Sequence, residues 1–427
     1  MKLTRRSFTK GLGALTTTIA ASAIAAPSLL RAQSKGRVVV IGGGAGGATL
    51  AKYVARDSKG ALEVVLVQES PRYSTCFYSN LYLGGMRSFG SITHGYDKLS
   101  ESYGVKLVFD RATGVDTTAK HVTLRDGQTL DYDVLAVAPG IEVIHDSIEG
   151  YGEAASKAMP HAWQAGQQTQ ILRRQLEALE DGGLFVISAP PNPYRCPPGP
   201  YERVSLVAHY FKQAKPRSKI LILDAKNKHS KQALFQEAWS NYYDGMIEWV
   251  PEEFGGKVEA VDAPSMTLIA GGEKHKAGVA NVIPAQRAGE IARLAGLTDD
   301  SGWCPIVPES MASRRVPGVY VVGAACIPGD MPKSAFSANS QAKVAAMAIR
   351  HQLTGSKAFP PRFRNTCWST LTASDAVKVG ANYEAAEEKI AKIDGFISEV
   401  GESAELREQT KLEADGWYAG ITNDIFG

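Results

Sequence analysis

Continuous apolar runs, each followed by glycines or polar residues, divide the chain into repeated units. The first run, Arg37 to Ile41, is rich in β-branched residues and predicts a buried parallel strand. A helix from about Gly46 to Arg56 and a second strand, Glu63 to Val67, complete one strand–helix–strand unit. A later run, Tyr132 to Val137, predicts a further strand that ends at the turn Ala138-Pro139-Gly140.

A second strand–helix–strand unit begins near residue 184. Its predicted parts are the strand Leu184 to Ser188, the helix Tyr201 to Gln213 and the strand Lys219 to Leu223. Further along come a strand, Val319 to Val322, and an alanine-rich helix, Ser337 to His351. The two units indicate a duplicated nucleotide-binding architecture.

The region beyond Phe359 has a different character. It is partly charged, and we expect the segment Tyr383 to Ile393 to be helical. No later stretch approaches about 18 uninterrupted apolar residues, so we expect no membrane insertion after the N-terminal segment.

The first unit carries a glycine-rich turn with the spacing G-x-G-x-x-G at Gly42, Gly44 and Gly47. It follows a strand and opens a helix, which is the context in which such glycines bind the pyrophosphate of a dinucleotide. An acidic residue usually ends the second strand and holds the ribose. Here Gln68 takes that position and Glu69 follows it; the uncharged Gln68 would bind a ribose more weakly.

The corresponding turn of the second unit cannot serve as a phosphate cradle. Between Ala189 and Pro200 stand six prolines, which lack backbone N–H donors, and only one glycine. A normal NAD site is therefore excluded on chemical grounds. The loop is either a rigid structural element or a holder that fixes Cys196 in one geometry.

The N-terminal segment, residues 1–32, reads as an export signal. Arg5 and Arg6, with Phe8 two positions later, precede a weakly apolar stretch rich in small residues, which predicts a twin-arginine signal peptide and a periplasmic protein. A Sec signal or a membrane anchor is the alternative. Removing its five basic residues takes the formal net charge from +3 to −2, so nothing indicates nucleic-acid binding.

The five cysteines require an explanation because their number is odd. One cysteine bonded to another group would leave four, and spacing does not choose among their three pairings. No C-x-x-C-H haem motif occurs, and no His/Cys spacing predicts a metal site. His145 and His161 are interpreted as ordinary surface or core histidines.

Several motifs together resemble one family. The chain is similar, over essentially its full length after the signal, to the flavoprotein subunit of flavocytochrome c sulfide dehydrogenase. The motifs are Tyr73-Ser74-Thr75-Cys76, Arg195-Cys196-Pro197-Pro198-Gly199-Pro200-Tyr201-Glu202, Gly302-Trp303-Cys304-Pro305, Met331-Pro332-Lys333-Ser334, Ser337-Ala338-Asn339-Ser340-Gln341, Asn365-Thr366-Cys367 and Phe426-Gly427.

The resemblance implies roles for individual residues. Cys76 would carry FAD through a thioether, which accounts for the odd cysteine count. Cys196 and Cys367 would form a redox-active disulfide beside the flavin, with Glu202 as an acid/base group near it. Trp417 would pack in the same pocket.

The resemblance leaves other assignments open. For Glu202 the alternative is a charge that complements a helix start, and for Trp417 it is plain core packing. Cys304 and Cys326 remain as candidates for a structural pair. Gly323, Lys333 and Ser337 are further predicted cofactor-binding positions, with the helix start at Ser337 facing negative charge on the reduced flavin.

The chain departs from the family pattern at two positions. Gly323-Ala324 stands where the flavin fingerprint reads Gly-Asp, and Gln68 replaces the ribose-binding acid. Hydrogen bonds to charged groups contribute about 1.5–3 kcal/mol each. We expect both changes to weaken non-covalent FAD binding, and a thioether at Cys76 to make the loss tolerable.

The predicted fold is α/β: two Rossmann-like dinucleotide-binding domains of the glutathione reductase type plus a C-terminal interface domain. The expected boundaries are 36–149 and 286–356 for the FAD domain, 150–285 for the second domain without an NAD site, and 357–427 for the C-terminal domain.

The resemblance implies a sulfide dehydrogenase subunit. It would oxidise hydrosulfide to sulfur or polysulfide and pass electrons to a separate c-type cytochrome subunit. The alternatives are a sulfide:quinone oxidoreductase, an accessory flavoprotein of a sulfur-oxidising complex and an NADH-dependent reductase, the last of which the proline loop disfavours.

Overall fold

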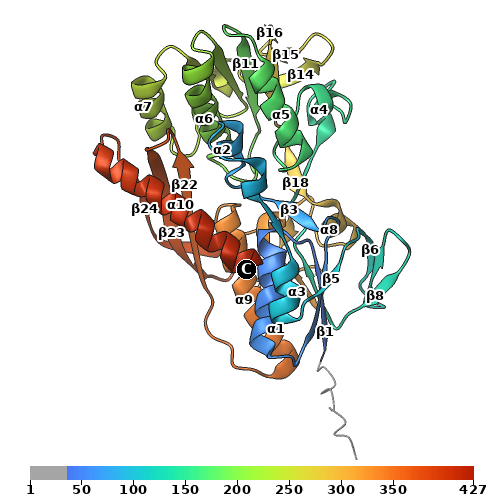
Figure 1. Cartoon of the computed structure of the whole chain (residues 1–427). Helices are drawn as coiled ribbons and strands as arrows, with labels where there is room; N and C mark the ends of the chain where they lie inside the picture. Colours follow the sequence, from blue (N-terminus) through green and yellow to red (C-terminus); the bar gives the residue numbers. More distant parts are fainter. Residues whose placement is uncertain (1–35) are drawn as a thin grey trace, which may run out of the picture. The chain divides into compact units, whose positions relative to one another are not determined.

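The computed structural model describes residues 36–427, so the predicted signal peptide lies outside the described part of the chain. Its first sheet is parallel, with the strand order β20-β9-β1-β2-β5. The strands are β1 (Arg37–Ile41), β2 (Glu63–Val67), β5 (Lys106–Val108), β9 (Val134–Val137) and β20 (Val319–Val321) (Figure 1). The central strand β1 is almost wholly buried, as its apolar sequence predicts.

Two helices pack beside this sheet, α1 (Ala45–Ser58) and α9 (Ala335–Thr354). Both are rich in alanine, which lets their backbones approach closely. β20 and α9 come from far beyond β9 in the sequence, so the first nucleotide domain is built from two separated segments.

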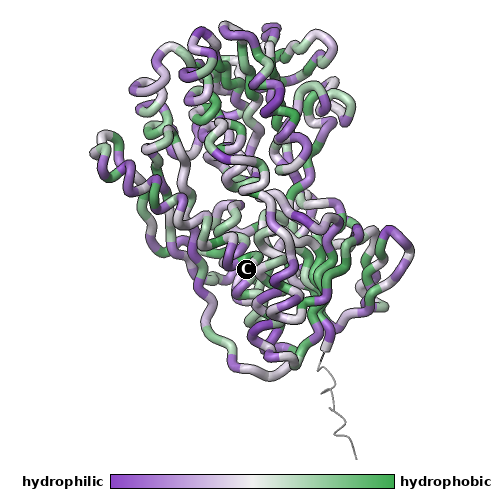
Figure 2. The backbone as a smooth tube through the Cα atoms, viewed as in Figure 1, coloured by the Kyte–Doolittle hydropathy of each residue, from purple (hydrophilic) through white to green (hydrophobic). Residues whose placement is uncertain are grey.

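The second sheet is also parallel and has the order β13-β12-β11-β17. Its parts and helices are β11 (Leu184–Ala189), β12 (Lys219–Asp224), β13 (Ile247–Val250), β17 (Val279–Val282), α5 (Gln167–Ala178), α6 (Gly199–Ala214) and α7 (Gln232–Tyr242). Apolar residues concentrate in the strands of both parallel sheets, as Figure 2 shows.

Shorter elements connect and flank the two sheets. They are β3 (Arg72–Ser74), α2 (Ser79–Leu83), β4 (Thr93–Gly95), α3 (Asp97–Tyr103), β6 (Ala112–Asp116), β7 (His121–Leu124), β8 (Thr129–Asp131), β10 (Ile141–Val143), α4 (Ala155–Ala158), β14 (Val258–Asp262), β15 (Thr267–Ala270), β16 (Glu273–Lys276), β18 (Gln286–Ala288), α8 (Glu290–Leu294), β19 (Cys304–Pro305) and β21 (Cys326–Ile327).

The C-terminal region is an antiparallel sheet followed by one long helix. Its elements are β22 (Arg362–Thr370), β23 (Ala376–Ala385), β24 (Ile390–Ile397) and α10 (Ala404–Phe426). The helix predicted over Tyr383 to Ile393 is wrong. That stretch ends β23, turns through Ala386, whose N–H donates to Lys389 O at 2.9 Å, and begins β24.

The error has a physical reason. The turn residues are good helix formers individually, but β23 is held between β22 and β24, and this pairing overrides local propensity. Most charged side chains of the segment lie in the exposed turn between β23 and β24, and Lys392 lies on the edge strand β24. Among the helices of residues 36–427, none combines the length and hydrophobicity needed to cross a bilayer.

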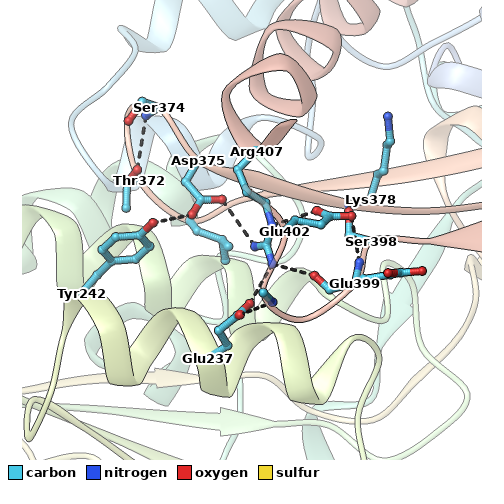
Figure 3. Close-up of polar contacts among 12 residues, drawn as sticks. Glu237, Tyr242, Thr372, Ser374, Asp375, Lys378, Ser398, Glu399, Glu402 and Arg407 are labelled. Carbon is cyan, nitrogen blue, oxygen red and sulfur yellow. Dashed lines mark hydrogen bonds and ion pairs between the residues drawn. The ribbon is translucent and has the colours of Figure 1, made fainter. Parts of the chain in front are cut away.

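Arg407 of α10 forms a buried ionic cluster that joins three parts of the chain (Figure 3). It is 5% exposed and contacts Glu237 of α7 at 2.7 Å, Glu402 at 2.8 Å and Asp375 at 3.6 Å. Tyr242 of α7 also donates to Asp375 at 2.6 Å. The second domain is thereby fastened to α10 and to the β22–β23 hairpin.

Replacing Arg407 by Met should destabilise the protein strongly. Removing one partner of a buried pair leaves uncompensated charge, which costs about 3–5 kcal/mol. We expect a matching fall in the free energy of unfolding from denaturant titration. Arg362→Met is the matched control, because its pair with Glu384 is exposed and such pairs contribute about 0–1 kcal/mol. Equal, small effects of both substitutions would contradict the role of the cluster.

Candidate active site

The glycine-rich turn after β1 is built for close backbone packing. Gly42 has φ 96°, and a Cβ there would lie 2.3 Å from Ala138 O. A Cβ on Gly47 would lie 1.8 Å from Gly42 O. No other residue fits these two positions, so α1 starts directly above β1 with its N-terminus at the cleft.

Three hollows lie along this turn and around the cysteines, and the second and third share lining residues. The first is lined by Gly42, Gln68 and Glu69 among others. The second is lined by Gly44, Gly46, Gly323, Ala324 and Cys76 among others. The third shares Cys76 with the second and adds Cys196 and Cys367. An elongated dinucleotide such as FAD fits this succession of a glycine cradle followed by a cysteine-lined end.

The residues at the expected ribose position have other contacts as well. Gln68 Oε1 accepts a hydrogen bond from Gly43 N at 2.7 Å, so the side chain braces the glycine turn. Glu69 pairs with Arg125 at 2.7 Å and is half exposed. Both side chains still border the first hollow.

Cys196 is held rigidly in the proline loop just before α6. Its backbone is in the left-handed region at φ 61°. Its N–H donates to Lys333 O at 2.8 Å, and its carbonyl accepts from Gly199 N at 2.9 Å. These backbone contacts hold Cys196 between the proline loop and the segment that leads into α9.

Gly199 gives the Cys196 sulfur its space. A Cβ at Gly199 would lie 3.0 Å from Cys196 Sγ and 2.7 Å from the Trp163 ring. The indole N–H of Trp163 in turn donates to Arg195 O at 3.1 Å. One wall of the cavity is thus formed by Gly199, Trp163 and the proline loop, which pack tightly against one another.

Cys367, which lies on β22, lines the same cavity. Asn365 Nδ2 lies 3.4 Å from its Sγ. Burial, then the nearby Cys367 and Glu202, raise the pKa of the Cys196 thiol, and Arg195 partly offsets this. All five cysteines of the chain are free thiols in this structure, so the Cys196–Cys367 disulfide stays a prediction.

Glu202 lies in the first turn of α6 but points across the cavity. Its Oε1 accepts from Thr370 N at 2.9 Å, and its Oε2 accepts from Asn80 Nδ2 at 2.8 Å. Burial raises the pKa of Glu202, while these two hydrogen bonds oppose the shift. A carboxyl group with a raised pKa, in a cavity with three thiols, is suited to proton transfer.

Two buried cations near Cys196 and Cys367 were not singled out by the sequence. Arg203 is 2% exposed and donates to Asn80, Asn281 and the carbonyls of His161 and Ala162. Burial lowers the pKa of Arg203 to about 9 and that of Lys231 to about 8. Arg203 follows Glu202 in a recognised motif, whereas Lys231 carries no sequence signal.

Aromatic side chains close the cavity on the side of α10. Trp417 stacks on Trp368 at 5.2 Å between ring centroids, and Phe77 and Phe336 lie nearby. Within residues 36–427, the indole N–H of Trp417 has no hydrogen-bond partner although it is buried. A buried hydrogen-bond donor that has no partner and borders a cavity is suited to bind a polar ligand.

The remaining predicted cofactor positions surround the start of α9. This helix begins at Ala335, two residues before the predicted start, and Ser334 caps it by accepting from Ser337 N at 3.0 Å. Ser337 is buried beneath the cap. Lys333 turns away: its Nζ donates to Ala324 O and Cys326 O and lies over the Trp303 ring. Lys333 thus touches the cavity wall through its carbonyl group.

Cys304 and Cys326 lie apart from this cavity. They are direct partners on the adjacent parallel strands β19 and β21, and both are fully buried. Their pairing stays a prediction.

In the second domain, side chains fill the space at the ends of β11 and β12. Asp224 is completely buried, pairs with Lys226 at 2.6 Å and accepts from Tyr201 Oη at 2.6 Å and Trp249 Nε1 at 3.0 Å. In open parallel sheets this crevice is where a dinucleotide binds. A ribose would have to displace this buried ion pair, whose hydrogen bonds are already made. Like the proline loop, the ion pair therefore disfavours an NAD site.

Comparison with known families first defines the class of protein. The model of the pyridine nucleotide-disulphide oxidoreductases matches residues 36–178. Two narrower models follow: the central region of the sulfide dehydrogenase (flavocytochrome c) flavoprotein chain matches residues 169–284, and the flavin-binding domain of flavocytochrome c sulphide dehydrogenase matches residues 359–426. The chain belongs to the flavocytochrome c sulfide dehydrogenase flavoprotein family, as the motifs predicted.

Curated relatives are more distant. The mitochondrial sulfide:quinone oxidoreductase of Mus musculus is 23% identical over 301 residues, 67% of this chain and 64% of that protein. The sulfide-quinone reductase of Aquifex aeolicus is 29% identical over 176 residues, 40% of this chain and 38% of that protein. The matches thus span less than two thirds of the length of either relative.

Solved structures agree on the fold. The X-ray structure of the Aquifex aeolicus sulfide:quinone oxidoreductase is 18% identical and superimposes with a TM-score of 0.74 over 91% of this chain and 92% of that one. The covalent putidaredoxin reductase–putidaredoxin complex is 16% identical, with a TM-score of 0.65 over 90% of this chain and 94% of that one. The predicted α/β fold with two dinucleotide-binding domains is confirmed.

Gly199→Ala should disturb the cavity wall. The added Cβ would overlap the Trp163 ring and press on Cys196 Sγ, and such overpacking costs about 1–3 kcal/mol. We expect a lower unfolding midpoint and an altered rate of Cys196 alkylation. Gly420→Ala is the control, because a Cβ there meets nothing within 4 Å; inside α10 it should be neutral or stabilising. Unchanged Cys196 reactivity in Gly199→Ala would refute the packing argument.

Proposed function

We propose that the protein oxidises hydrosulfide through a Cys196–Cys367 disulfide beside bound FAD and delivers the electrons to a c-type cytochrome. The observation that carries the proposal is the single cavity that contains Cys76, Cys196, Cys367 and Glu202 at the end of the glycine-lined cleft. The family to which the chain belongs supports it.

The cavity suits an anionic sulfur nucleophile. Arg195 and Arg203 both line it, and their positive charge favours the hydrosulfide ion over neutral molecules. A disulfide is the natural electrophile for hydrosulfide by thiol–disulfide exchange. The attack breaks the Cys196–Cys367 bond, forms a persulfide on one cysteine and leaves a thiolate on the other. Glu202, whose pKa is raised by burial, is the carboxyl group in the cavity that can exchange a proton with the sulfur groups.

FAD would supply a two-electron acceptor that can return electrons one at a time. Gly42, Gly44 and Gly47 with the N-terminus of α1 would hold its pyrophosphate. Cys76 borders both the second hollow and the cysteine cavity, which supports a thioether from its thiol to the flavin. The start of α9 would face the flavin ring from Ser334 and Ala335.

The export signal predicted from residues 1–32 supports a periplasmic location for this chemistry. A c-type cytochrome is the acceptor that the family name implies. The filled crevice around Asp224 makes a nicotinamide acceptor a poor alternative.

Sulfide turnover tests this function directly. Flavin-loaded protein with sodium sulfide should reduce added mitochondrial cytochrome c, followed by its absorbance. Cys196→Ser and Cys367→Ser should fall to background, because each removes one half of the disulfide. Cys304→Ser should remain active, since its sulfur lies outside the cavity. Normal turnover by Cys196→Ser would rule the mechanism out.

Covalent attachment predicts a mass change. The denatured protein should carry the mass of one FAD on the peptide that contains Cys76. Cys76→Ser should lose its FAD on desalting, because Ala324 and Gln68 stand where the family has FAD-binding acids. Cys326→Ser is the control and should keep the flavin. Full retention of FAD by Cys76→Ser would contradict the compensation that we propose.

Quinone reduction is the second candidate activity, favoured by the relatives in mouse and Aquifex aeolicus. The same assay separates the two activities. A soluble quinone analogue reduced faster than cytochrome c would support the quinone acceptor.

A further inference from the structure

Lys231 is a buried cation next to Cys367 without an acidic partner. It precedes α7, is 6% exposed, and donates from Nζ to Cys367 O at 3.0 Å and to Ser369 Oγ at 2.7 Å. Within residues 36–427 no carboxylate oxygen lies within 4.0 Å of its Nζ. Lys226, the other deeply buried lysine of this domain, instead has Asp224 at 2.6 Å. A buried charge without a counterion is expensive, which indicates that its partner is a group that becomes charged only during the reaction.

The groups that face Lys231 identify this partner. Cys367 of β22 makes the largest favourable contribution to its charged form, ahead of Glu202 of α6 and Cys196. Glu202 already accepts from Thr370 and Asn80. Tyr383 of β23 also lies near Cys367. In the disulfide state neither sulfur carries charge, so the cations of this centre are then in excess.

The two sulfurs differ in their surroundings. Asn365 Nδ2 lies 3.4 Å from Cys367 Sγ. The Lys231 ammonium donates to the backbone carbonyl oxygen of Cys367. Cys196 is packed against Trp163 and Gly199. Arg195 and Arg203 line the cavity beside it, but burial still raises the pKa of the Cys196 thiol. In thiol–disulfide exchange, the sulfur that better supports negative charge leaves faster.

We propose that Lys231 is the charge partner of the Cys367 thiolate and makes Cys367 the leaving sulfur when hydrosulfide opens the disulfide. The inference rests on the proposed function. The hydrosulfide sulfur forms a bond to Cys196 Sγ, and the Cys196–Cys367 bond breaks with its electron pair remaining on Cys367. The proton of hydrosulfide stays on the outer sulfur of the Cys196 persulfide, so atoms and electrons balance without a further oxidant.

Alkylation of Cys367 tests the charge effect. In flavin-loaded, full-length Cys196→Ser protein, the rate of iodoacetamide modification of Cys367 is followed against pH by peptide mass spectrometry. Adding Lys231→Gln removes the charge but keeps hydrogen-bond donors. It should lower the rate of Cys367 alkylation near neutral pH about tenfold, because the thiolate loses its nearby positive charge.

Two matched variants separate charge from architecture. Lys231→Arg keeps the charge and should retain most of the reactivity of the Lys231 protein. Ser369→Ala removes the second hydrogen-bond partner of Lys231 but leaves the ammonium beside Cys367, so the alkylation profile should not shift. A Lys231→Gln profile that coincides with that of the Lys231 protein would overturn the proposal.

A single turnover tests the direction of opening. One equivalent of sulfide is added to the disulfide form, and the products are trapped by rapid alkylation in acid. The trapped persulfide should lie on the Cys196 peptide, and Lys231→Gln should distribute it over both cysteines. A persulfide on Cys367 in the unaltered protein would overturn the proposal. If that protein takes up no sulfur, the proposed function fails, and the alkylation series still decides the role of Lys231.

Discussion

The hydrogen bond from Cys196 N–H to Lys333 O is the contact on which the cavity depends. It joins the proline loop of the second domain to the segment that leads into α9 of the first. Because Cys196 is fixed at this junction, α6 begins directly behind it and presents Glu202 and Arg203 to the same space. A loop with freely rotating backbone could not hold a sulfur at one point between two domains; prolines on both sides of Cys196 remove that freedom.

The prolines of the loop before α6 have two effects: they disfavour a phosphate site and they hold Cys196 in place. A phosphate cradle needs backbone N–H groups and room for close approach, and the loop before α6 offers neither. The crevice that would have taken a dinucleotide is instead occupied by Asp224 and its partners. The second domain keeps the strand–helix–strand frame but uses it to carry a cysteine.

Sequence reasoning succeeded where local chemistry decides the structure. β1 and β2 have the predicted bounds because buried parallel strands are continuous apolar runs, and the glycine turn is dictated by contacts such as Gly47 with Gly42. It failed at Tyr383 to Ile393, where helix-forming residues are held in a hairpin by pairing that the local pattern does not encode.

Pairings between distant residues could not be predicted either. Arg407 acquires its role from Glu237, a partner in another domain, and Lys231 acquires its role from Cys367. A lone lysine or arginine in a sequence is most often a solvated surface charge, so only the folded chain shows that these two are buried.

The electrostatics of the cavity bear on how its chemistry is directed. Arg195 and Arg203 line the space next to Cys196, whereas Lys231 lies behind Cys367, outside the residues that line the cavity. Charge in front of one sulfur draws an anion toward it; charge behind the other sulfur stabilises the thiolate that departs. A symmetric arrangement would let hydrosulfide attack either sulfur. In the proposed mechanism, the asymmetry of the buried cations gives the disulfide a direction, without any difference in the covalent chemistry of its two halves.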